Sequence, residues 1–184
     1  MDSRSDLQGK RVMVTGASGF TGRYMVAELR AQGCQVIGQG SRRGPDDLGE
    51  FVEADLRDEA ALAAAVSAAR ADMVVHLAAV AFVAHGNAED FYNVNLLGTR
   101  NLLSALERCE HPVEKILLAS SANIYGNRSA GTLDESTPPS PANDYAVSKL
   151  AMEHVAGLWR DRLPVVITRP FNYAALRSAH ERAD

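Results

Sequence analysis

Hydrophobic residues along the chain follow two alternating patterns: short continuous apolar runs, and longer stretches with apolar positions three or four residues apart. The short runs are typical of buried strands, and the longer periodic stretches are typical of amphipathic helices. The apolar runs predict strands at residues 11–15, 35–38, 51–53, 73–77, 115–120 and 165–169. The periodic stretches predict helices at residues 21–32, 59–69, 90–108 and 144–161.

This alternation of strand and helix predicts an α/β fold. Apolar strands without polar alternation indicate a parallel sheet buried on both faces, and right-handed crossovers then give a doubly wound sheet, the Rossmann fold. Polar segments rich in Gly and Pro at residues 39–50 and 126–143 predict loops. Ligands of doubly wound sheets bind at the carboxyl ends of the strands, so functional residues are expected there.

Composition narrows the class of protein. With 184 residues, 46% hydrophobic and 23% charged, the chain is expected to be globular rather than disordered. Its 23 acidic and 19 basic residues give a net charge of −4, so no nucleic-acid partner is expected. Cys34 and Cys109 lack the spacing of a disulfide framework or a zinc site. A polar segment at residues 1–6 and an interrupted apolar stretch at 73–84 predict a cytoplasmic protein without a membrane span.

A glycine-rich turn follows the first predicted strand and opens the first predicted helix. Gly16 permits the tight turn, Gly19 lets the backbone approach a pyrophosphate, and Gly22 allows the helix to pack closely on the strand. The helix N-terminus adds free N–H groups and a positive dipole. Glycines also mark plain turns, but this strand–turn–helix context favours dinucleotide binding. The expected cofactor contacts here are Gly16, Ser18, Gly19, Phe20, Thr21 and Gly22.

The end of the second predicted strand bears on the choice of cofactor. A carboxylate at this position would bind the ribose 2′-hydroxyl of NAD, but residues 36–40 contain no Asp or Glu. Ser41, Arg42 and Arg43 follow, and arginines suit a 2′-phosphate. The pattern favours NADP(H) over NAD(H), and the alternative is a solvated basic loop.

Polar residues at two other strand ends have alternative interpretations. Asp55 is expected to accept a hydrogen bond from the adenine amino group with Leu56 against the ring, and it is also a candidate N-cap of the helix that begins near Glu59. His76 lies on a buried strand, and no second ligand stands at a suitable spacing for a metal site. A core or cofactor-adjacent histidine is therefore expected, with no metal.

A tyrosine and a lysine stand four residues apart in the last predicted helix. This spacing puts Tyr145 and Lys149 on one face, where an ammonium group lowers the pKa of a phenol toward the working range. The hydroxyls of Ser120 and Ser121, at the end of the fifth predicted strand, can donate to a substrate carbonyl. Each pair alone is typical of a surface pair or a turn, but together, behind a nucleotide loop, they favour catalysis.

These motifs together resemble the extended short-chain dehydrogenase/reductase family, also called the NAD-dependent epimerase/dehydratase family. The resemblance covers residues 11–173 and rests on the glycine turn, Asp55-Leu56, His76-Leu77-Ala78-Ala79, Asn95 with Gly98-Thr99, Ser121, Tyr145 with Lys149, and Arg169-Pro170-Phe171-Asn172. It implies that Tyr145 is the general acid/base, Lys149 its activator and Ser121 the hydrogen-bond donor to the carbonyl. It implies further cofactor contacts at Leu77, Ala78, Ala79, Asn95, Tyr145, Lys149, Pro170 and Phe171. The substrate contacts it implies are Val80, Ser121, Ala122, Asn123 and Asn172.

The resemblance also implies an activity, because such enzymes mostly act on nucleotide sugars. Dehydratases of the family carry an acidic residue just after the catalytic hydroxyl, where this chain has Ala122 and Asn123. Epimerases and dehydratases recycle a resident NAD, whereas a net reductase must exchange its cofactor, and NADPH suits it. The expected reaction is reduction of GDP-4-keto-6-deoxy-D-mannose to GDP-D-rhamnose. The alternatives are a UDP-hexose 4-epimerase with tightly bound NAD and a non-catalytic NADP-binding sensor.

The expected domain organisation is one NADP-binding Rossmann domain over residues 1–173, followed by an atypical tail at 174–184. Family members continue into a smaller substrate-binding part of about 100 residues, and the tail does not resemble its start. That part is therefore expected to be missing or truncated. The resemblance further implies a homodimer that pairs the helices at 90–108 and 144–161.

Overall fold

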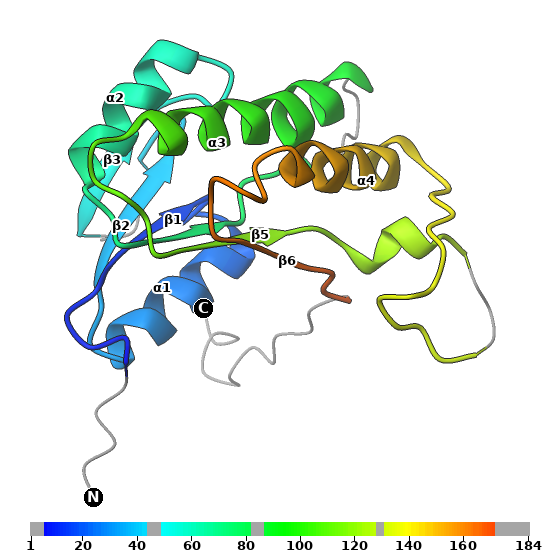
Figure 1. The fold of residues 1–184 in the computed structure, drawn as a ribbon, viewed down its shortest axis with the longest axis horizontal. Helices are drawn as coiled ribbons and strands as arrows, with labels where there is room; N and C mark the ends of the chain where they lie inside the picture. The colour runs from blue at the N-terminus through cyan, green and yellow to red at the C-terminus, as the bar shows by residue number, and fades with distance from the viewer. Residues whose placement is uncertain (1–5, 44–48, 82–86, 128–130, 172–184) are drawn as a thin grey trace, which may run out of the picture.

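The computed structural model describes residues 6–43, 49–81, 87–127 and 131–171. Within these residues the chain forms a six-stranded parallel sheet in the order β3-β2-β1-β4-β5-β6 (Figure 1). The strands are β1 (Arg11–Thr15), β2 (Gln35–Gly40), β3 (Glu50–Glu53), β4 (Met73–His76), β5 (Lys115–Ala119) and β6 (Val165–Thr168). The order reverses between β1 and β4, which confirms the predicted doubly wound α/β fold.

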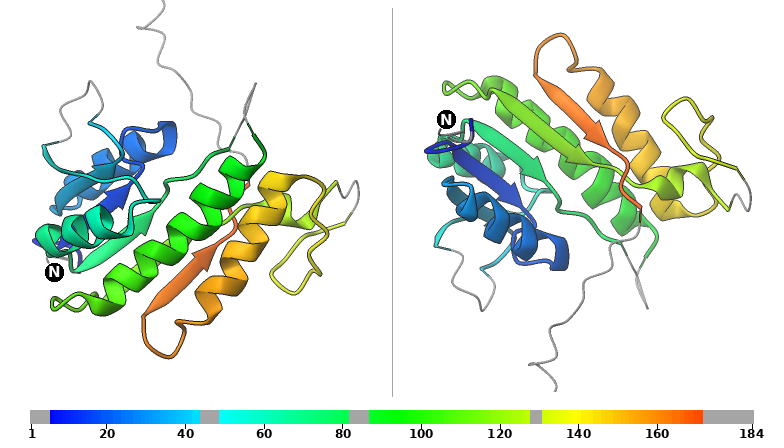
Figure 2. Two further views of the ribbon diagram at one scale, coloured as in Figure 1. Left: turned by 90° about the horizontal axis from the view of Figure 1, so that it is seen from above. Right: turned by 90° about the horizontal axis from the view of Figure 1, so that it is seen from below.

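Helices cover the two faces of this sheet unequally (Figure 2). In the described part of the chain, α1 (Phe20–Ala31) lies alone on one face, and α2 (Glu59–Ala69), α3 (Thr99–Arg108) and α4 (Asp144–Gly157) lie on the other. This distribution follows from right-handed crossovers. The crossover from β1 to β2 runs toward one side of the sheet and puts α1 on one face, whereas the crossovers from β3 to β4, β5 and β6 run toward the other side and put their helices on the opposite face. The carboxyl ends of β1 and β4 therefore border the crevice at the reversal.

Local sequence signals set the helix ends. The side chains of Asp58 and Asn143 cap α2 and α4 by accepting hydrogen bonds from the N–H groups of Ala61 and Ala146 at 3.0 and 2.8 Å. Such a cap contributes about 1 kcal/mol. Gly33 follows α1 with φ at +82°, a conformation that glycine adopts without steric cost.

Apolar side chains fill a core on each face of the sheet. The larger core, under α2, α3 and α4, includes Met13 and Ile37, which are fully buried. The smaller core, under α1, includes Val12, Val14 and Val26. Alternate residues of β1 thus point into opposite cores, as a strand buried on both faces requires.

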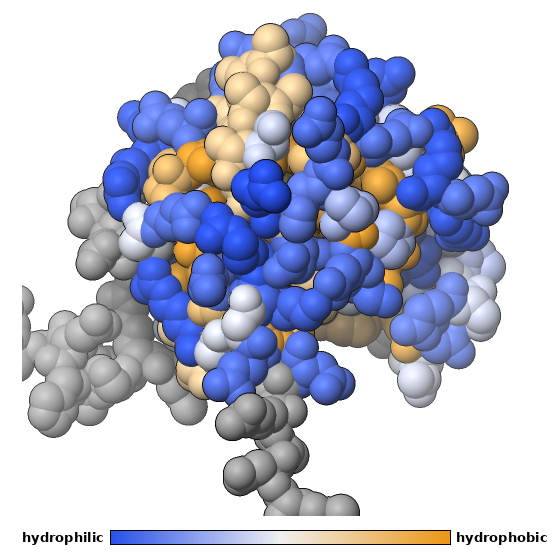
Figure 3. Space-filling model, turned by 60° about the vertical axis from the view of Figure 1, so that its left-hand side comes forward, coloured by the Kyte–Doolittle hydropathy of each residue, from blue (hydrophilic) through white to orange (hydrophobic). Residues whose placement is uncertain are grey.

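One side of the outer surface is polar for the most part. Figure 3 shows one side of the molecule as largely hydrophilic, with hydrophobic residues in smaller groups between the polar ones. Among the described helices, none combines the length and the apolar character of a membrane span. Large hydrophobic side chains that remain exposed include Phe20, Tyr24, Leu97, Leu158 and Phe171.

The helix predicted over residues 90–108 is not a continuous α-helix. Its first part, η1 (Phe91–Gly98), has the wider turns of a π-helix and passes directly into α3. Asn95 is buried in η1, where its side chain accepts a hydrogen bond from the Val80 N–H at 2.8 Å and donates to the Val80 carbonyl at 3.0 Å. Gly98 lies so near Leu56 that a β-carbon at residue 98 would come within 2.8 Å of the Leu56 β-carbon. Sequence periodicity does not report such contacts with distant loops.

Other element boundaries also differ from the prediction. β2 extends to Gly40 because that residue pairs with Glu53 of β3. A short 3-10 helix, η2 (Ala122–Tyr125), follows β5. α4 ends at Gly157 rather than at residue 161, and the indole N–H of Trp159 then donates to Glu107 at 2.7 Å, which fixes the turns that follow.

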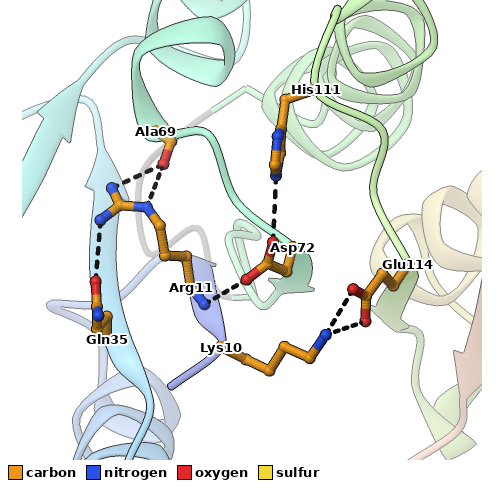
Figure 4. Close-up of polar contacts among 7 residues, drawn as sticks. All are labelled: Lys10, Arg11, Gln35, Ala69, Asp72, His111 and Glu114. Carbon is orange, nitrogen blue, oxygen red and sulfur yellow. Dashed lines mark hydrogen bonds and ion pairs between the residues drawn. The ribbon is translucent and has the colours of Figure 1, made fainter. Parts of the chain in front are cut away.

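Charged and polar side chains connect the amino-terminal ends of neighbouring strands of the sheet (Figure 4). Asp72, just before β4, accepts a hydrogen bond from the backbone N–H of Arg11 at 2.8 Å and lies 3.2 Å from Nε2 of His111. Lys10 forms an ion pair with Glu114 at 2.6 Å. The Arg11 N–H, with smaller contributions from His111 and Lys10, holds the pKa of Asp72 below its ordinary value. The ionised carboxylate therefore stabilises the folded chain.

Replacing Asp72 by Asn should lower the free energy of unfolding by about 1 kcal/mol at neutral pH, because a neutral acceptor replaces a charged one. The folded-state pKa of Asp72 is lowered, so this stabilisation is present above the unfolded pKa of about 4 and is lost as the pH falls through the folded value. Denaturant unfolding of both proteins from neutral to strongly acidic pH should show the difference vanish. The exposed Asp6→Asn is the control, and a loss at Asp72 that persists in acid would contradict the prediction.

Candidate functional site

The turn between β1 and α1 is too tight for side chains at two of its glycines. Gly16 adopts φ at +69°, and a β-carbon there would lie 2.8 Å from the backbone nitrogen of Ala78. A β-carbon at Gly22 would lie 2.2 Å from the Gly16 carbonyl oxygen, so α1 packs directly on the turn. Gly19 is the N-cap residue of α1 and supplies no side-chain cap. The first N–H groups of the helix can therefore bind an anion such as a pyrophosphate.

Two adjoining cavities lie along the carboxyl ends of the strands. Their volumes are about 750 Å³ and about 470 Å³, and both are lined by Gly16, Gly19, Leu77 and Ala79. They therefore form one groove across the reversal between β1 and β4. A groove of this length and place fits a dinucleotide with its pyrophosphate over the glycine turn.

The first cavity gathers residues predicted to bind the cofactor, among them all those predicted for its adenosine half. Its predicted members are Gly16, Ser18, Gly19, Ser41, Arg42, Arg43, Asp55, Leu56, Leu77, Ala78 and Ala79. Val80, predicted as a substrate contact, lines this cavity and is absent from the lining of the second. The lining residues that the sequence analysis missed are Gln39, Gly40, Ala54, Arg57 and Val94. The carboxyl ends of β2 and β3 were a usable signal for the first three.

Two charged side chains of the first cavity form an ion pair with each other. Asp55 pairs with Arg57 at 2.6 Å, and its side-chain hydrogen bond with Arg57 holds the pKa of Asp55 below its ordinary value. The alternative that Asp55 caps α2 is wrong, because Asp58 accepts the capping hydrogen bond three residues closer to the helix. The Arg43 guanidinium lies 5.8 Å from the centre of the Phe51 ring.

The second cavity gathers the residues predicted for catalysis. Its predicted members are Gly16, Gly19, Phe20, Thr21, Gly22, Leu77, Ala79, Ser121, Asn123, Tyr145, Lys149, Pro170 and Phe171. Ser120, whose hydroxyl the sequence analysis offered beside that of Ser121, also lines this cavity, and the lining residues that it missed are Ala81 and Ala119. Ala122 is buried and lines neither cavity, and Asn172 lies outside the described residues, as does the tail at 174–184.

The groups expected to react come from α4 and from the turn after β5. Lys149 is 3% exposed, its Nζ donates to the Ala119 carbonyl at 2.7 Å, and burial lowers its pKa to about 8. Tyr145 stands one turn earlier, with the Phe91 ring 6.1 Å away in an edge arrangement. Oγ of Ser121 accepts a hydrogen bond from the Asn123 N–H at 3.2 Å, which leaves its own O–H free to donate.

A buried hydrogen-bonded network joins the elements that line the two cavities. The Thr99 hydroxyl donates to the Asn95 carbonyl at 2.7 Å, so it accepts from Nε2–H of His76 at 2.8 Å. Nδ1 of His76 then accepts from the Thr15 hydroxyl at 2.7 Å, whose oxygen accepts the Ala78 N–H at 3.1 Å. Burial, reinforced by the charge of Lys149, lowers the pKa of His76 to about 3. His76 is thus a neutral core histidine, as expected.

The same network continues to α4, which carries Tyr145 and Lys149. Nδ2 of Asn95 donates to Oγ of Ser148 at 3.0 Å, and the Ser148 hydroxyl donates to the Tyr145 carbonyl at 2.7 Å. Asn95 lines neither cavity, so it contacts the predicted site through Val80 rather than directly. No cluster of potential metal ligands occurs among the described residues.

A family model of the NAD dependent epimerase/dehydratase family matches residues 12–184. The chain belongs to this family. Among curated members, GDP-6-deoxy-D-talose 4-dehydrogenase of Aggregatibacter actinomycetemcomitans is 34% identical over 168 residues, which cover 90% of this chain and 54% of that protein. The chain spans about half the length of the curated epimerase/dehydratase proteins it matches.

Solved structures of the epimerase/dehydratase family share the same architecture. A candidate epimerase from Burkholderia cenocepacia J2315 is 50% identical, with a TM-score of 0.84 over 95% of this chain and 58% of that one. The UDP-glucose 4-epimerase of Thermus thermophilus in complex with NAD is 34% identical, with a TM-score of 0.77 over 86% of this chain and 54% of that one. These similarities confirm the family and the fold.

Two glycine substitutions should separate folding from cofactor binding. Gly22→Ala should unfold or strongly destabilise the chain, because its β-carbon meets the Gly16 carbonyl at 2.2 Å. Gly19→Ala should fold, because its β-carbon would lie 3.2 Å from its nearest neighbour, but the methyl group occupies space that the pyrophosphate needs. Thermal unfolding and fluorescence titration with NADPH measure the two effects. Unchanged NADPH affinity in Gly19→Ala would contradict the placement of the pyrophosphate.

Proposed function

We propose that the protein is an NADPH-dependent nucleotide-sugar oxidoreductase that reduces GDP-4-keto-6-deoxy-D-mannose to GDP-D-rhamnose. The chain spans about half the length of its curated relatives, so the proposal concerns the whole protein. One observation carries it. Ser121, Tyr145 and Lys149 line one cavity that continues into the glycine turn. A hydroxyl donor, a phenol and a cation thus surround the place where the nicotinamide half of a dinucleotide would lie.

The chemistry divides between the cofactor and the chain. Bound NADPH supplies a hydride to the C4 carbonyl carbon of the sugar. The O–H of Ser121 donates to the carbonyl oxygen, and Tyr145 protonates that oxygen as it becomes a hydroxyl. The Lys149 ammonium, present below a pKa of about 8, stabilises the phenolate that Tyr145 leaves behind. Phe20 and Phe171 line the same cavity and supply part of its apolar wall.

The choice of a reductase rests on the residues after Ser121. Ala122 is buried and Asn123 lines the second cavity, so neither position offers the carboxylate that water elimination requires. By its name, the relative from Aggregatibacter actinomycetemcomitans oxidises C4 of a GDP-6-deoxy sugar. The reverse of such a step is a C4 reduction of the kind proposed here, and the configuration of the new hydroxyl distinguishes talose from rhamnose products.

The choice of NADPH rests on the adenosine end of the groove. Gly40 ends β2 without a carboxylate, and Arg42 and Arg43 line the cavity beside it. Two guanidinium groups at this place suit the 2′-phosphate of NADPH. The adjacent Asp55–Arg57 ion pair reduces the charge that Asp55 would otherwise present to a phosphate.

A UDP-hexose 4-epimerase is the second candidate function. It is favoured by the UDP-glucose 4-epimerase of Thermus thermophilus, a structure in complex with NAD that is 34% identical. Conversion of UDP-galactose to UDP-glucose without added cofactor would favour this candidate.

The assembly that we propose is a cytoplasmic homodimer in which η1, α3 and α4 pair with the same elements of a second copy. The exposed apolar side chains of Leu97, Val147 and Leu158 support this proposal.

Replacing Tyr145 by Phe should lower turnover of the 4-keto sugar by about 100-fold or more, because the proton donor is removed. NADPH binding should stay within about twofold, because the ring and its packing against Phe91 remain. Steady-state kinetics and calorimetric titration measure the two quantities, and Tyr24→Phe, an exposed tyrosine on α1, is the matched control. Full turnover in Tyr145→Phe would exclude this mechanism, and a non-catalytic NADP sensor would show no turnover in either protein.

Replacing Arg42 and Arg43 together by Ala should weaken NADPH binding by roughly 10- to 100-fold, because charge-assisted hydrogen bonds to the 2′-phosphate are lost. NADH binding should change little. Calorimetric titration with each cofactor measures both affinities, with the exposed Arg160→Ala as a control for loss of positive charge. Equal losses for the two cofactors would overturn the assignment of NADPH.

A further inference from the structure

Arg169 joins the three segments that carry the proposed catalytic groups. It directly follows β6 and precedes Pro170, which lines the second cavity. Its guanidinium forms a bidentate ion pair with Glu153 of α4, in which Nε donates to Oε1 at 3.0 Å and Nη2 donates to Oε2 at 2.7 Å. Glu153 lies one helical turn beyond Lys149, and its side chain is 9% exposed. A paired and buried carboxylate therefore stands next to the lysine expected to activate Tyr145.

The same guanidinium also holds the turn that presents Ser121. Nη1 of Arg169 donates to the Tyr125 hydroxyl at 2.8 Å, and the guanidinium lies 5.4 Å from the centre of the Tyr125 ring. Tyr125 ends η2 and is 3% exposed. On either side of Arg169 the backbone binds the same turn, because the Thr168 carbonyl accepts from Ser120 at 2.8 Å and the Pro170 carbonyl accepts from Ala122 at 2.9 Å. Ser121 is thus fixed relative to Arg169 from both sides.

The charges around Lys149 come from few groups. From α4, Glu153 raises the pKa of Lys149, and burial lowers it by a larger amount. From β4, the imidazole of His76 is neutral, because its pKa is about 3. Tyr145 is the phenol that shares its face of α4, and the Arg169 guanidinium is paired with Glu153, one turn beyond Lys149. The balance between Glu153 and Arg169 is therefore the adjustable part of the field at Lys149.

We propose that Arg169 and Glu153 are positioning residues that set the charge of Lys149 and lock the Ser121 turn to the catalytic helix. The proposal rests on the proposed function, in which Lys149 and Ser121 act on the substrate. It assigns the ion pair a task that simple cross-linking would not require, because an anion favours and a cation disfavours the charged form of a nearby lysine. Removing Glu153 leaves an unpaired cation near the ammonium, and removing Arg169 leaves an unpaired carboxylate near it.

The chain offers a direct measurement, because it contains only three lysines, Lys10, Lys115 and Lys149. Carbon NMR of the 184-residue chain labelled at lysine Cε resolves each titration without substrate or cofactor. Lys10 is ion-paired with Glu114, which raises its pKa, so Lys149 is the signal that titrates first. Single substitutions of the other two lysines complete the assignment.

Glu153→Gln should lower the midpoint of the Lys149 titration by about one pH unit, and Arg169→Gln should raise it by about the same amount. The double variant, with two amides of similar size, should return toward the parent value. Where Arg169→Gln does not fold, Glu153→Gln alone still decides, because loosening of the site would hydrate Lys149 and raise its midpoint instead of lowering it. The matched control pair is Glu59→Gln and Arg108→Gln, which removes an ion pair between α2 and α3.

Shifts of the same sign in both variants, or no shift beyond that of the control pair, would overturn the proposal.

Tyr125→Phe separately tests whether Arg169 positions the Ser121 turn, because it removes the hydroxyl that accepts from Arg169 and leaves the ion pair with Glu153 intact. It should lower kcat by about tenfold while the Lys149 midpoint and the KM for NADPH stay unchanged, and an unchanged kcat would refute the positioning of Ser121. The NMR result is independent of turnover, so failure of the proposed reaction would leave the shifts of Lys149 in place and remain distinguishable.

Discussion

The buried network around His76 is the constraint on which the rest of the site depends. It joins the end of β1 to the end of β4 through Thr15 and reaches η1 through Thr99. Because both ring nitrogens are committed, one as donor and one as acceptor, the network has one consistent direction of hydrogen bonds. Burial disfavours a charged imidazole and the charge of Lys149 adds to this effect, which explains the strongly lowered pKa of His76. A protonated ring would also offer no acceptor to the Thr15 hydroxyl. The glycine turn and α4 are therefore both held in place by hydrogen bonds that lead back to β1 and β4.

Most of the fold could be predicted from the sequence because its signals are local. Apolar runs located all six described strands, and glycine spacing placed the turn before α1. Part of the lining of both cavities was found where the glycine turn, the strand ends and the i, i+4 spacing of Tyr145 and Lys149 put it. These features depend on backbone geometry that neighbouring residues impose, so a single chain is enough to recognise them. The family resemblance, and not local pattern, supplied Leu77, Ala78, Ala79, Asn123, Pro170 and Phe171.

The features that escaped prediction depend on contacts between distant segments. The π-helical turns of η1 depend on the bonds from Asn95 to Val80, fifteen residues earlier in the chain. The cap of α2 could be assigned to Asp55 or Asp58 by residue type, and only the hydrogen bond to Ala61 decides between them. The reach of Arg169 to Glu153 spans sixteen residues and two elements. None of these leaves a periodic pattern in the sequence.

The burial of Lys149 has a thermodynamic consequence for the whole chain. Its pKa of about 8, against an ordinary value of 10.5, means that the folded state holds this proton less tightly than the unfolded chain does. By linkage, that difference costs on the order of 3 kcal/mol of folding free energy at neutral pH. Net stability of about 5 to 15 kcal/mol is typical of domains, so the cost at this one side chain is roughly a fifth to a half of the net stability of such a domain. The reactive site is thus a point of stored free energy, which the apolar cores on both faces of the sheet must offset.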